Sequence, residues 1–216
     1  MRISILISAF LWVGVVGYAQ RTDIKTVAGD CENGEALVIY KNGDRYDGFF
    51  KDSLYHGEGY LKKKNKEVYD GEFANGMYDG YGYLQLPNKD EYEGFFKEGL
   101  YDGEGTLWEK SGKTYTGTFV KGLMDGKGTL ILENGDKYIG SFKAGVIDGY
   151  GEYYSQGFLT TGLFKNGKIV NGRMVNLGTQ EVVLIESGKP KKEDDATKRK
   201  DSVTVIEILP RKKNVE

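Results

Sequence analysis

Apolar and small residues alternate with polar ones along most of the chain, and the pattern returns with a fixed period of 23 residues (Tyr46 to Tyr69). In each unit a tyrosine, a glycine and a phenylalanine occupy alternate positions, and a later G-x-G-x-L string alternates in the same way. Because alternate side chains of a β-strand lie on one face, each unit predicts two strands with an aromatic–glycine face and a more polar face. A fixed period of this kind indicates a repeat architecture. The signature positions are Tyr46, Gly48, Phe50, Tyr69, Gly71, Phe73, Tyr92, Gly94, Phe96, Tyr115, Gly117, Phe119, Tyr138, Gly140 and Phe142.

The register of the two strands in a unit follows from the same alternation. Leu130 and Tyr138 must share a face, so an odd number of residues separates the strands, and the loop 133–135 with a left-handed glycine satisfies this. Lys66 and Lys89 stand at the glycine position in two other units. They would either cost about 1 kcal/mol in the left-handed conformation or require five-residue loops.

The register also predicts where the glycines lie relative to the phenylalanine rings. It places Gly126 beside Phe142 within one hairpin, and Gly149 beside Phe142 on the following strand, with Gly140 beside Gly151. Each phenylalanine would then have a glycine on both sides, which leaves room for the ring to lie over bare backbone.

A six-residue connection is expected after each phenylalanine, and each connection carries an apolar pair. We expect these pairs to fold back and thicken a core that one sheet cannot make alone. The alternative is an exposed ridge that contacts a partner. The pairs are Leu54–Tyr55, Met77–Tyr78, Leu100–Tyr101, Leu123–Met124 and Val146–Ile147.

The pattern Y-x-G-x-F-x-x-G-x-x-x-G-x-G resembles the MORN repeat (membrane occupation and recognition nexus), over roughly 33–172. A half unit with Ala36 at the second glycine position precedes five full repeats, and a degenerate unit with Thr160 at the tyrosine position follows them. Such end units are typical of caps in repeat proteins. The repeats predict an all-β fold, an elongated antiparallel β-hairpin repeat solenoid with a single twisted sheet, over 33–178.

The start of the chain is typical of a secretory signal peptide over residues 1–19. Met1 and Arg2 precede a 14-residue apolar run (3–16), and small residues at 17 and 19 precede Gln20. A retained membrane anchor is the alternative, although the run is shorter than the roughly 20 apolar residues that a membrane span needs. A short leader, 20–32, connects the signal peptide to the array.

The end of the chain, 179–216, has a different character. Residues 181–185 and 202–209 alternate as strands do, while 187–201 is charged and predicts a flexible linker. The sequence indicates no partner for the second of these strands.

Composition excludes several function classes. The net charge of −2 argues against a general nucleic-acid-binding protein, which needs a basic face. Cys31 is the single cysteine, so it cannot close an internal disulfide. We expect an inert thiol; an intermolecular disulfide is the alternative.

One aspartate recurs in four units and could in principle hold a metal. Equivalent side chains of consecutive units lie roughly 10 Å apart, whereas calcium ligands lie about 2.3–2.6 Å from the ion, so neighbouring units cannot share one. The preferred interpretation is a turn in which aspartate binds its own backbone. These residues are Asp79, Asp102, Asp125 and Asp148, with His56 in the same place one unit earlier.

No catalytic or cofactor-binding group of residues is found. No Ser/His/Asp set is available because the one histidine, His56, occupies a turn position of the repeat, and the G-x-G pairs lack the G-K-[ST] of phosphate-binding loops. MORN arrays in some plant proteins precede a phosphoinositide kinase domain, but kinase motifs do not occur here. No catalytic, metal-binding or cofactor-binding residue is therefore predicted, and no small-molecule substrate.

Six aromatic residues are expected on the face opposite the signature aromatics. Rows of exposed aromatic side chains are typical of recognition surfaces, and scattered surface tyrosines are the alternative. They are Tyr60, Tyr81, Tyr83, Tyr150, Phe49 and Phe95.

We therefore expect a non-enzymatic, exported interaction or scaffolding protein of the cell envelope, located in the periplasm, at the cell surface or secreted. Its partner would be another protein or a copy of itself. The alternative, which the family name implies, is peripheral binding to membrane phospholipid. The basic end 211–213 favours it, and the lack of a dominant basic stripe in the array argues against it. A hydrolase is a third alternative, without the constellation of residues that it needs.

Overall fold

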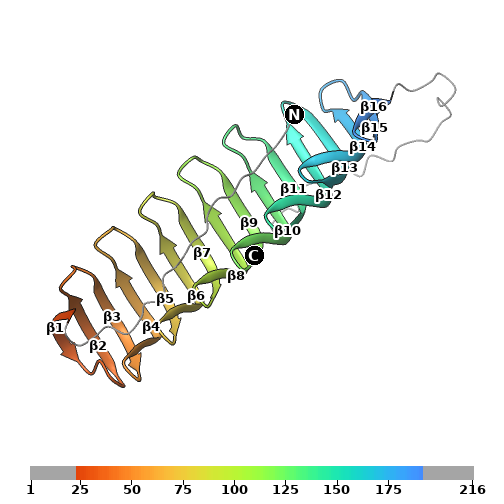
Figure 1. The fold of residues 1–216 in the computed structure, drawn as a ribbon. Helices are drawn as coiled ribbons and strands as arrows, with labels where there is room; N and C mark the ends of the chain where they lie inside the picture. Colours follow the sequence, from red (N-terminus) through yellow and green to blue (C-terminus); the bar gives the residue numbers. More distant parts are fainter. Residues whose placement is uncertain (1–22, 192–216) are drawn as a thin grey trace, which may run out of the picture.

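The computed structural model describes residues 23–191, which form sixteen antiparallel strands arranged in a row along an elongated molecule (Figure 1). The signal peptide predicted at 1–19 and the strand predicted at 202–209 lie outside these residues. Within the described range no helix is long and apolar enough to cross a membrane. The strands are β1 (Ile24–Gly29), β2 (Glu35–Tyr40), β3 (Arg45–Lys51), β4 (Leu54–Lys62), β5 (Val68–Ala74), β6 (Met77–Gln85), β7 (Glu91–Lys97), β8 (Leu100–Trp108), β9 (Thr114–Val120), β10 (Leu123–Ile131), β11 (Lys137–Lys143), β12 (Val146–Ser155), β13 (Phe158–Lys165), β14 (Lys168–Asn176), β15 (Val182–Glu186) and β16 (Lys189–Lys191).

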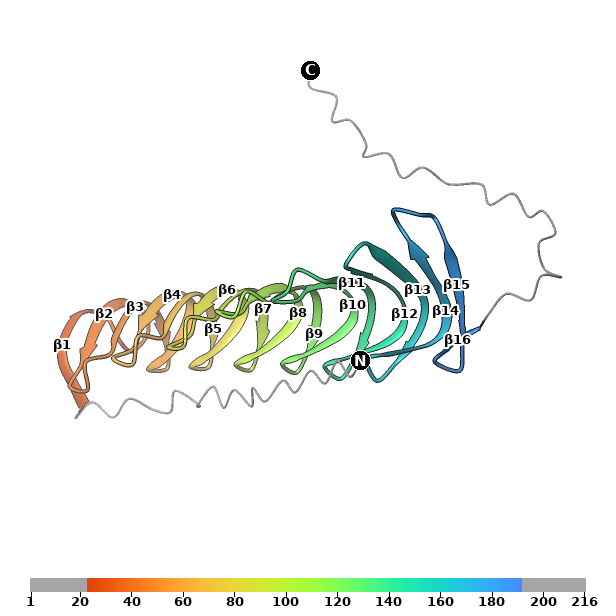
Figure 2. The same cartoon turned by 90° about the horizontal axis from the view of Figure 1, so that it is seen from above.

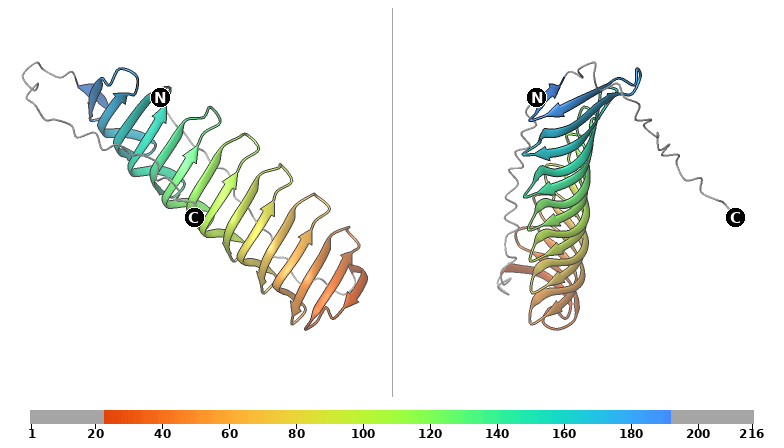
Figure 3. Two further views of the ribbon diagram at one scale, coloured as in Figure 1. Left: turned by 180° about the vertical axis from the view of Figure 1, so that it is seen from behind. Right: turned by 90° about the vertical axis from the view of Figure 1, so that its right-hand side faces the viewer.

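Each strand pairs with the strand before and after it in the sequence, so one sheet runs from β1 to β16 in sequential order. The sheet twists along its length and its strands curve, as Figures 2 and 3 show. The predicted all-β array of hairpins in a single sheet is confirmed.

Three-residue loops connect the strands within each repeat, as the register predicted. Gly135 (φ 83°) donates its backbone N–H to the carbonyl oxygen of Leu132 at 2.9 Å. Lys66 and Lys89, both with φ 77°, occupy the same left-handed position, so these loops also have three residues. Leu130 pairs with Tyr138, which confirms the predicted register.

Between repeats the predicted six-residue connection is wrong. A two-residue turn, Ala144–Gly145, joins β11 to β12, and both residues have positive φ (47° and 82°), as the tight turns of β-hairpins require. The next strand therefore begins at Val146. It reaches its regular register through a β-bulge at which Gly149 has φ 120°.

The bulge changes one predicted pairing. Gly140 pairs with Gly151 and Gly126 pairs with Phe142, as expected, but the partner of Phe142 on β12 is Ile147 and not Gly149. The phenylalanine therefore has a glycine on one side only. The expectation assumed an unbroken ladder, whereas a bulge inserts extra residues on one strand and bends it.

The apolar pairs lie at the start of these bent strands, and the second residue of each pair is buried. The prediction that the pairs thicken the core therefore holds for the second residue only, because the first residue stays at least partly exposed. The buried second residues are Tyr55, Tyr78, Tyr101, Met124 and Ile147.

The second glycine of G-x-G makes room for a tyrosine ring, which corrects the expected role in accommodating phenylalanine. A Cβ built on Gly151 would overlap the Tyr138 ring, and the same holds for Gly140. The ring lies along its own strand over both glycines, and its hydroxyl donates to the carbonyl oxygen of Ser141 at 3.2 Å. The bulge leaves Ser141 out of the ladder with β12, so the tyrosine hydroxyl supplies a donor for that carbonyl.

The buried rings form one continuous cluster along the array. Tyr46 stacks on Tyr55 with ring centroids 3.7 Å apart, and Phe73 of the next repeat meets Tyr46 edge-on at 5.3 Å. The same contacts recur in the next two repeats, where Tyr69 stacks on Tyr78 and Tyr92 on Tyr101. Each repeat thus completes its core only by contact with its neighbour.

The ends of the sheet extend beyond the predicted array. β1 lies inside the segment 20–32 that was expected to be a leader, and β16 lies inside the expected linker 187–201. Near the C-terminal end, β15 occupies the place of the strand expected at 181–185. In the degenerate end units, Ala36 and Thr160 are both buried at the positions of the missing glycine and tyrosine.

Candidate interaction surface

The recurring aspartates connect consecutive repeats. Asp102 accepts a hydrogen bond from the backbone N–H of Lys121, at 3.0 Å, in the turn of the next repeat. In that same turn, Gly122 N–H donates to the carbonyl oxygen of Tyr101 at 2.8 Å. Asp79 and Asp125 make the equivalent bonds, to Glu98 and Ala144. The expectation that each aspartate binds its own backbone is wrong in this detail, because the acceptor faces the following repeat.

Asparagines take over this contact at both ends of the array. Asn33 accepts from Asp52 N–H at 3.0 Å, and Asn171 accepts from Ser187 N–H at 3.0 Å. An amide oxygen suffices for this hydrogen bond, so the recurring aspartates are explained by their contact with the turn of the next repeat. His56 is half-buried at the equivalent place. Residues 23–191 contain no group of three or more His, Cys, Asp and Glu side chains placed to hold a metal ion.

The face opposite the buried rings carries two rows of side chains that run along the array, separated by the line of paired glycines. Row A, over β3–β14, holds Phe49, Glu58, Glu72, Tyr81, Phe95, Glu104, Thr118, Lys127, Ser141, Tyr150, Leu163 and Asn171. Row B holds Asp47, Tyr60, Asp70, Tyr83, Glu93, Thr106, Thr116, Thr129, Ile139, Glu152, Thr161 and Arg173.

The rows differ sharply between the two halves of the array. In β3–β8 the twelve positions of rows A and B are six carboxylates, five aromatic rings and Thr106, without a single cation. We call these eleven charged and aromatic residues the acidic–aromatic surface. In β9–β14 the same twelve positions are six small polar residues, one aromatic and two aliphatic residues, one carboxylate, Glu152, and two cations, Lys127 and Arg173.

Five of the six predicted aromatic residues belong to the acidic–aromatic surface, and Tyr150 lies apart from them in the other half of the array. Phe49, Tyr81 and Phe95 keep 48%, 46% and 48% of their surface exposed. The carboxylates that alternate with these rings are not among the residues predicted from the sequence. The signal that could have identified them is the acidic residue between the fixed positions, as in Y-D-G, Y-E-G and G-E-G.

Tyr81 lies at the centre of this surface and is held on three sides. Its backbone N–H donates to Glu72 Oε1 at 2.9 Å, and its hydroxyl donates to Glu93 Oε1 at 2.9 Å. Its ring meets the ring of Phe95 edge-on, with centroids 5.4 Å apart. These contacts hold a large exposed ring in one orientation, which lowers the entropy cost of binding to it.

The pKa of the tyrosine hydroxyls is raised on both faces of the sheet. Burial raises the pKa of the inner tyrosines, to about 12 for Tyr138. On the outer face the hydrogen bond to Glu93 raises the pKa of the Tyr81 hydroxyl, and burial raises that of Tyr83. All these hydroxyls therefore remain protonated donors at neutral pH.

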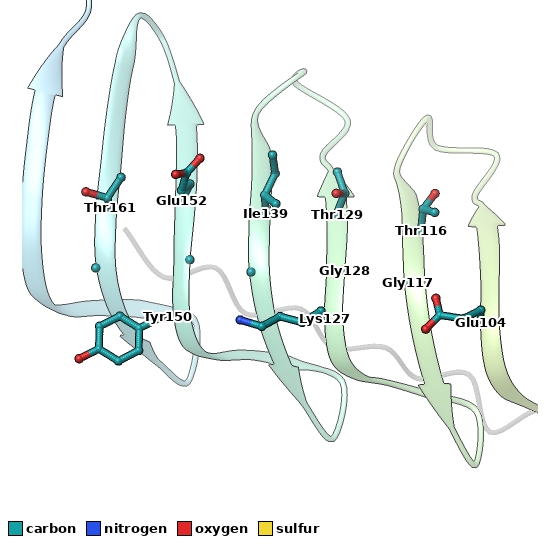
Figure 4. Close-up of a pocket in the computed structure, with 13 residues that line it drawn as sticks. Glu104, Thr116, Gly117, Lys127, Gly128, Thr129, Ile139, Tyr150, Glu152 and Thr161 are labelled. Carbon is teal, nitrogen blue, oxygen red and sulfur yellow. The ribbon is translucent and has the colours of Figure 1, made fainter. Parts of the chain in front are cut away.

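The C-terminal half of the outer face contains a shallow groove of about 780 Å³, shown in Figure 4. Its floor is the glycine line, with Lys127 and Tyr150 on one side and Thr129 and Ile139 on the other. Tyr150 is 70% exposed.

The groove also contains two carboxylates, which bear on the hydrolase alternative. Glu104 lies on β8 and Glu152 on β12, so four strand spacings, about 19 Å, separate them along the sheet. This exceeds the roughly 5–9.5 Å between the carboxylates of glycosidases.

Comparisons with known proteins bear on the fold and the repeat. The family model described as MORN repeat matches residues 46–67, 69–91, 92–113, 115–137 and 138–157. No curated protein matches the sequence. Among solved structures, the chain is similar to the SAS-4 (dCPAP) TCP domain in complex with a proline-rich motif of Ana2 (dSTIL) of Drosophila melanogaster. That match has 14% identity and a TM-score of 0.45, and covers 78% of this chain and 89% of that one. A likeness of this size informs neither the site nor the function.

Proposed function

This chain belongs to the MORN repeat family, and we propose that it is a non-enzymatic interaction or scaffolding protein that binds a protein partner, or a second copy of itself, through the outer face of its array. The family is one of non-catalytic binding repeats, which supports an interaction role. The observation that carries the proposal is the set of three exposed rings, Phe49, Tyr81 and Phe95, of which Tyr81 and Phe95 hold each other by an edge-on contact.

The shape of the surface supports this role. Exposed aromatic rings are enriched at the centres of protein interfaces, where they bury large areas at a low entropy cost. The rings here project from a sheet whose own core lies on the opposite face, so they are available without unfolding any part of the array. A partner could therefore dock on a preformed platform.

Export to the cell envelope is part of the proposal. It rests on the signal-peptide pattern in residues 1–19. Export would be tested by sequencing the N-terminus of the protein purified from its native organism, where an N-terminus at Gln20 is expected. An N-terminus at Met1 would contradict cleavage.

Binding to membrane phospholipid is the second candidate. The basic residues 211–213 and the family name favour it, whereas the carboxylates of the acidic–aromatic surface would repel anionic headgroups. Flotation with vesicles containing anionic phospholipid, with and without residues 187–216, separates the two functions. Flotation that depends on the tail would favour the lipid function, and no flotation of either form would exclude it.

The protein-binding function is tested with three substitutions: Phe49→Thr, Tyr81→Thr and Phe95→Thr. Threonine is suitable because Thr118 occupies the equivalent position one repeat after Phe95. The wild-type chain from residue 20 and the triple variant are each cross-linked to their partners in the envelope fraction of the native organism. Separately, light scattering measures the mass of each purified protein, which shows whether it is a monomer or a dimer. We expect a partner, or a dimer, that the triple variant loses.

A matched control is Tyr150→Thr, which removes an exposed ring from the other half of the same face. It should leave the complex intact. Equal loss in the control, or a monomer without cross-linked partner in the wild type, would contradict the proposal.

A further inference from the structure

The acidic–aromatic surface contains charge that nothing in the rows neutralises. Glu58 and Glu72 are direct cross-strand neighbours on β4 and β5, and both are exposed. Like charges placed directly opposite in a sheet destabilise it. Cations lie only beside the rows, near the strand ends, where Arg45 pairs with Asp47 at 3.0 Å. An arrangement that lowers the stability of the free protein is typical of a surface whose residues serve binding.

The order of residues along row B is the second observation. From β3 to β7 the row reads Asp47, Tyr60, Asp70, Tyr83, Glu93, so each ring lies between two carboxylates. Neighbouring strands are about 4.8 Å apart. One bound cation could therefore stack on a ring and contact the carboxylate beside it.

We propose that the acidic–aromatic surface binds a segment of a partner protein that is rich in arginine and lysine. The proposal rests on the protein-binding function above and specifies the chemistry of the partner. A planar guanidinium group stacks on aromatic rings and donates two parallel hydrogen bonds to a carboxylate, so arginine fits both components of the surface. Charge complementarity selects a cationic protein segment over an anionic membrane, whose headgroups these carboxylates repel.

The two halves of the array provide the contrast that makes the proposal specific. The equivalent rows over β9–β14 carry one carboxylate and two cations, Lys127 and Arg173, on the same backbone geometry. A cationic segment should therefore bind to β3–β8 and not to β9–β14, although both expose aromatic residues.

The experiment measures the binding of a fluorescein-labelled peptide, five repeats of Arg-Ser-Ser, to the chain from residue 20 by fluorescence anisotropy. A peptide with glutamate in place of arginine serves as the probe control. The variant Glu58→Gln/Glu72→Gln removes two charges from the surface and keeps the side-chain shape. Its matched control, Glu133→Gln/Glu152→Gln, removes the same number of charges from exposed or half-buried positions in the other half.

We expect the wild type to bind the arginine peptide and not the glutamate peptide, with an affinity that falls at high salt. Glu58→Gln/Glu72→Gln should weaken binding at least tenfold and raise the melting temperature, because it removes a repulsion. The matched control should weaken binding less than twofold. A wild type that does not bind the arginine peptide, or equal weakening in both double variants, would overturn the proposal.

The failure of this proposal can be told apart from the failure of the proposed function. Suppose that the triple aromatic variant loses a partner, but the arginine peptide does not displace that partner and Glu58→Gln/Glu72→Gln still binds it. This outcome would overturn the cationic chemistry and leave the interaction function standing. The absence of any partner or dimer would overturn both.

Discussion

The inner and outer faces of this sheet follow opposite rules. At the signature positions of the inner face the same residue returns in each full repeat, and Tyr46, Tyr69 and Tyr92 are all fully buried, each stacked on a second tyrosine. On the outer face equivalent positions change from Phe95 to Thr118 to Ser141. Packing dictates the first set, because each ring must fit against the next repeat. The second set is free to vary, so it can carry recognition that differs along the array.

The largest expected effect is unfolding at alkaline pH, caused by ionisation of the buried tyrosines of the inner face. Burial raises the pKa of the inner tyrosines, to about 12 for Tyr138, above the roughly 10 of the unfolded chain. The folded state then keeps protons that the unfolded state loses, so stability is complete below about pH 10 and declines above it. Each such tyrosine lowers the free energy of unfolding by about 1.4 kcal/mol per pH unit above 10. Because several tyrosines act together, we expect unfolding near pH 11.

Absorbance at 295 nm and circular dichroism measured on the same sample check this. Most of the tyrosine ionisation should coincide with the loss of β-structure. If most tyrosines ionised while the circular dichroism signal persisted, the inner face would not be closed as described.

Gly105→Ala tests the fit of the inner glycines. The new Cβ would overlap the Tyr92 ring, and we expect a loss of about 3 kcal/mol in the free energy of unfolding. A double-mutant cycle in urea with Tyr92→Leu should show favourable coupling of at least about 1 kcal/mol, and one with Phe96→Leu should show little. Coupling to Phe96 instead would restore the view that the glycines accommodate phenylalanine.

Asp102→Ala tests the contact between repeats. It leaves the N–H of Lys121 without its acceptor, at an expected cost of about 1–2 kcal/mol in urea denaturation. Asp102→Asn should be close to neutral, because Asn33 and Asn171 make the same bond at the array ends. An asparagine variant as unstable as the alanine variant would show that the negative charge itself is required.

Two hydroxyls in one stacked pair of rings give a finer test. Tyr92 donates to the carbonyl oxygen of Phe95 at 3.0 Å, whereas the buried hydroxyl of Tyr101 has no hydrogen-bond partner in the described structure. Tyr92→Phe should therefore cost about 1 kcal/mol, and Tyr101→Phe should be neutral or stabilise by up to about 1 kcal/mol. Equal losses in thermal melts would mean that Tyr101 has a partner, such as a buried water.

Tyr81→Thr with Phe95→Thr should have only a small effect on stability. The pair is half exposed, so we expect a loss of about 0.5 kcal/mol in the free energy of unfolding, from their edge-on ring contact. Binding of a partner should nevertheless be lost. A stability loss as large as that of Gly105→Ala would show that the outer rings belong to the core and would end the distinction between the two faces.

Most of the repeat could be predicted from its periodicity. The pairing of Leu130 with Tyr138 follows from alternation alone, because a shift by one residue would expose every ring. The bulge at Gly149 could not be predicted in this way. Spacing does not distinguish the first glycine of G-x-G, which takes a positive φ at the bulge, from the second, which clears a tyrosine ring.

The surface was predictable only in part, since the sequence identified its aromatic positions without grouping them. Tyr81 and Phe95 are in contact, while Tyr150 lies in the other half of the face. Which carboxylates adjoin which rings depends on strand neighbours, and those neighbours depend on the register of all sixteen strands.

The sequence by itself determined the two strands of each full repeat, the three-residue loops and the face on which the signature side chains lie, because these depend on local alternation and turn chemistry. Only the tertiary structure decided which ring each glycine accommodates, that Asp102 reaches a turn nineteen residues away, and that Glu58 opposes Glu72. Those outcomes depend on how one repeat bends and packs against the next. Side-chain direction and bulge geometry control that packing, and neither can be predicted from the spacing of residues.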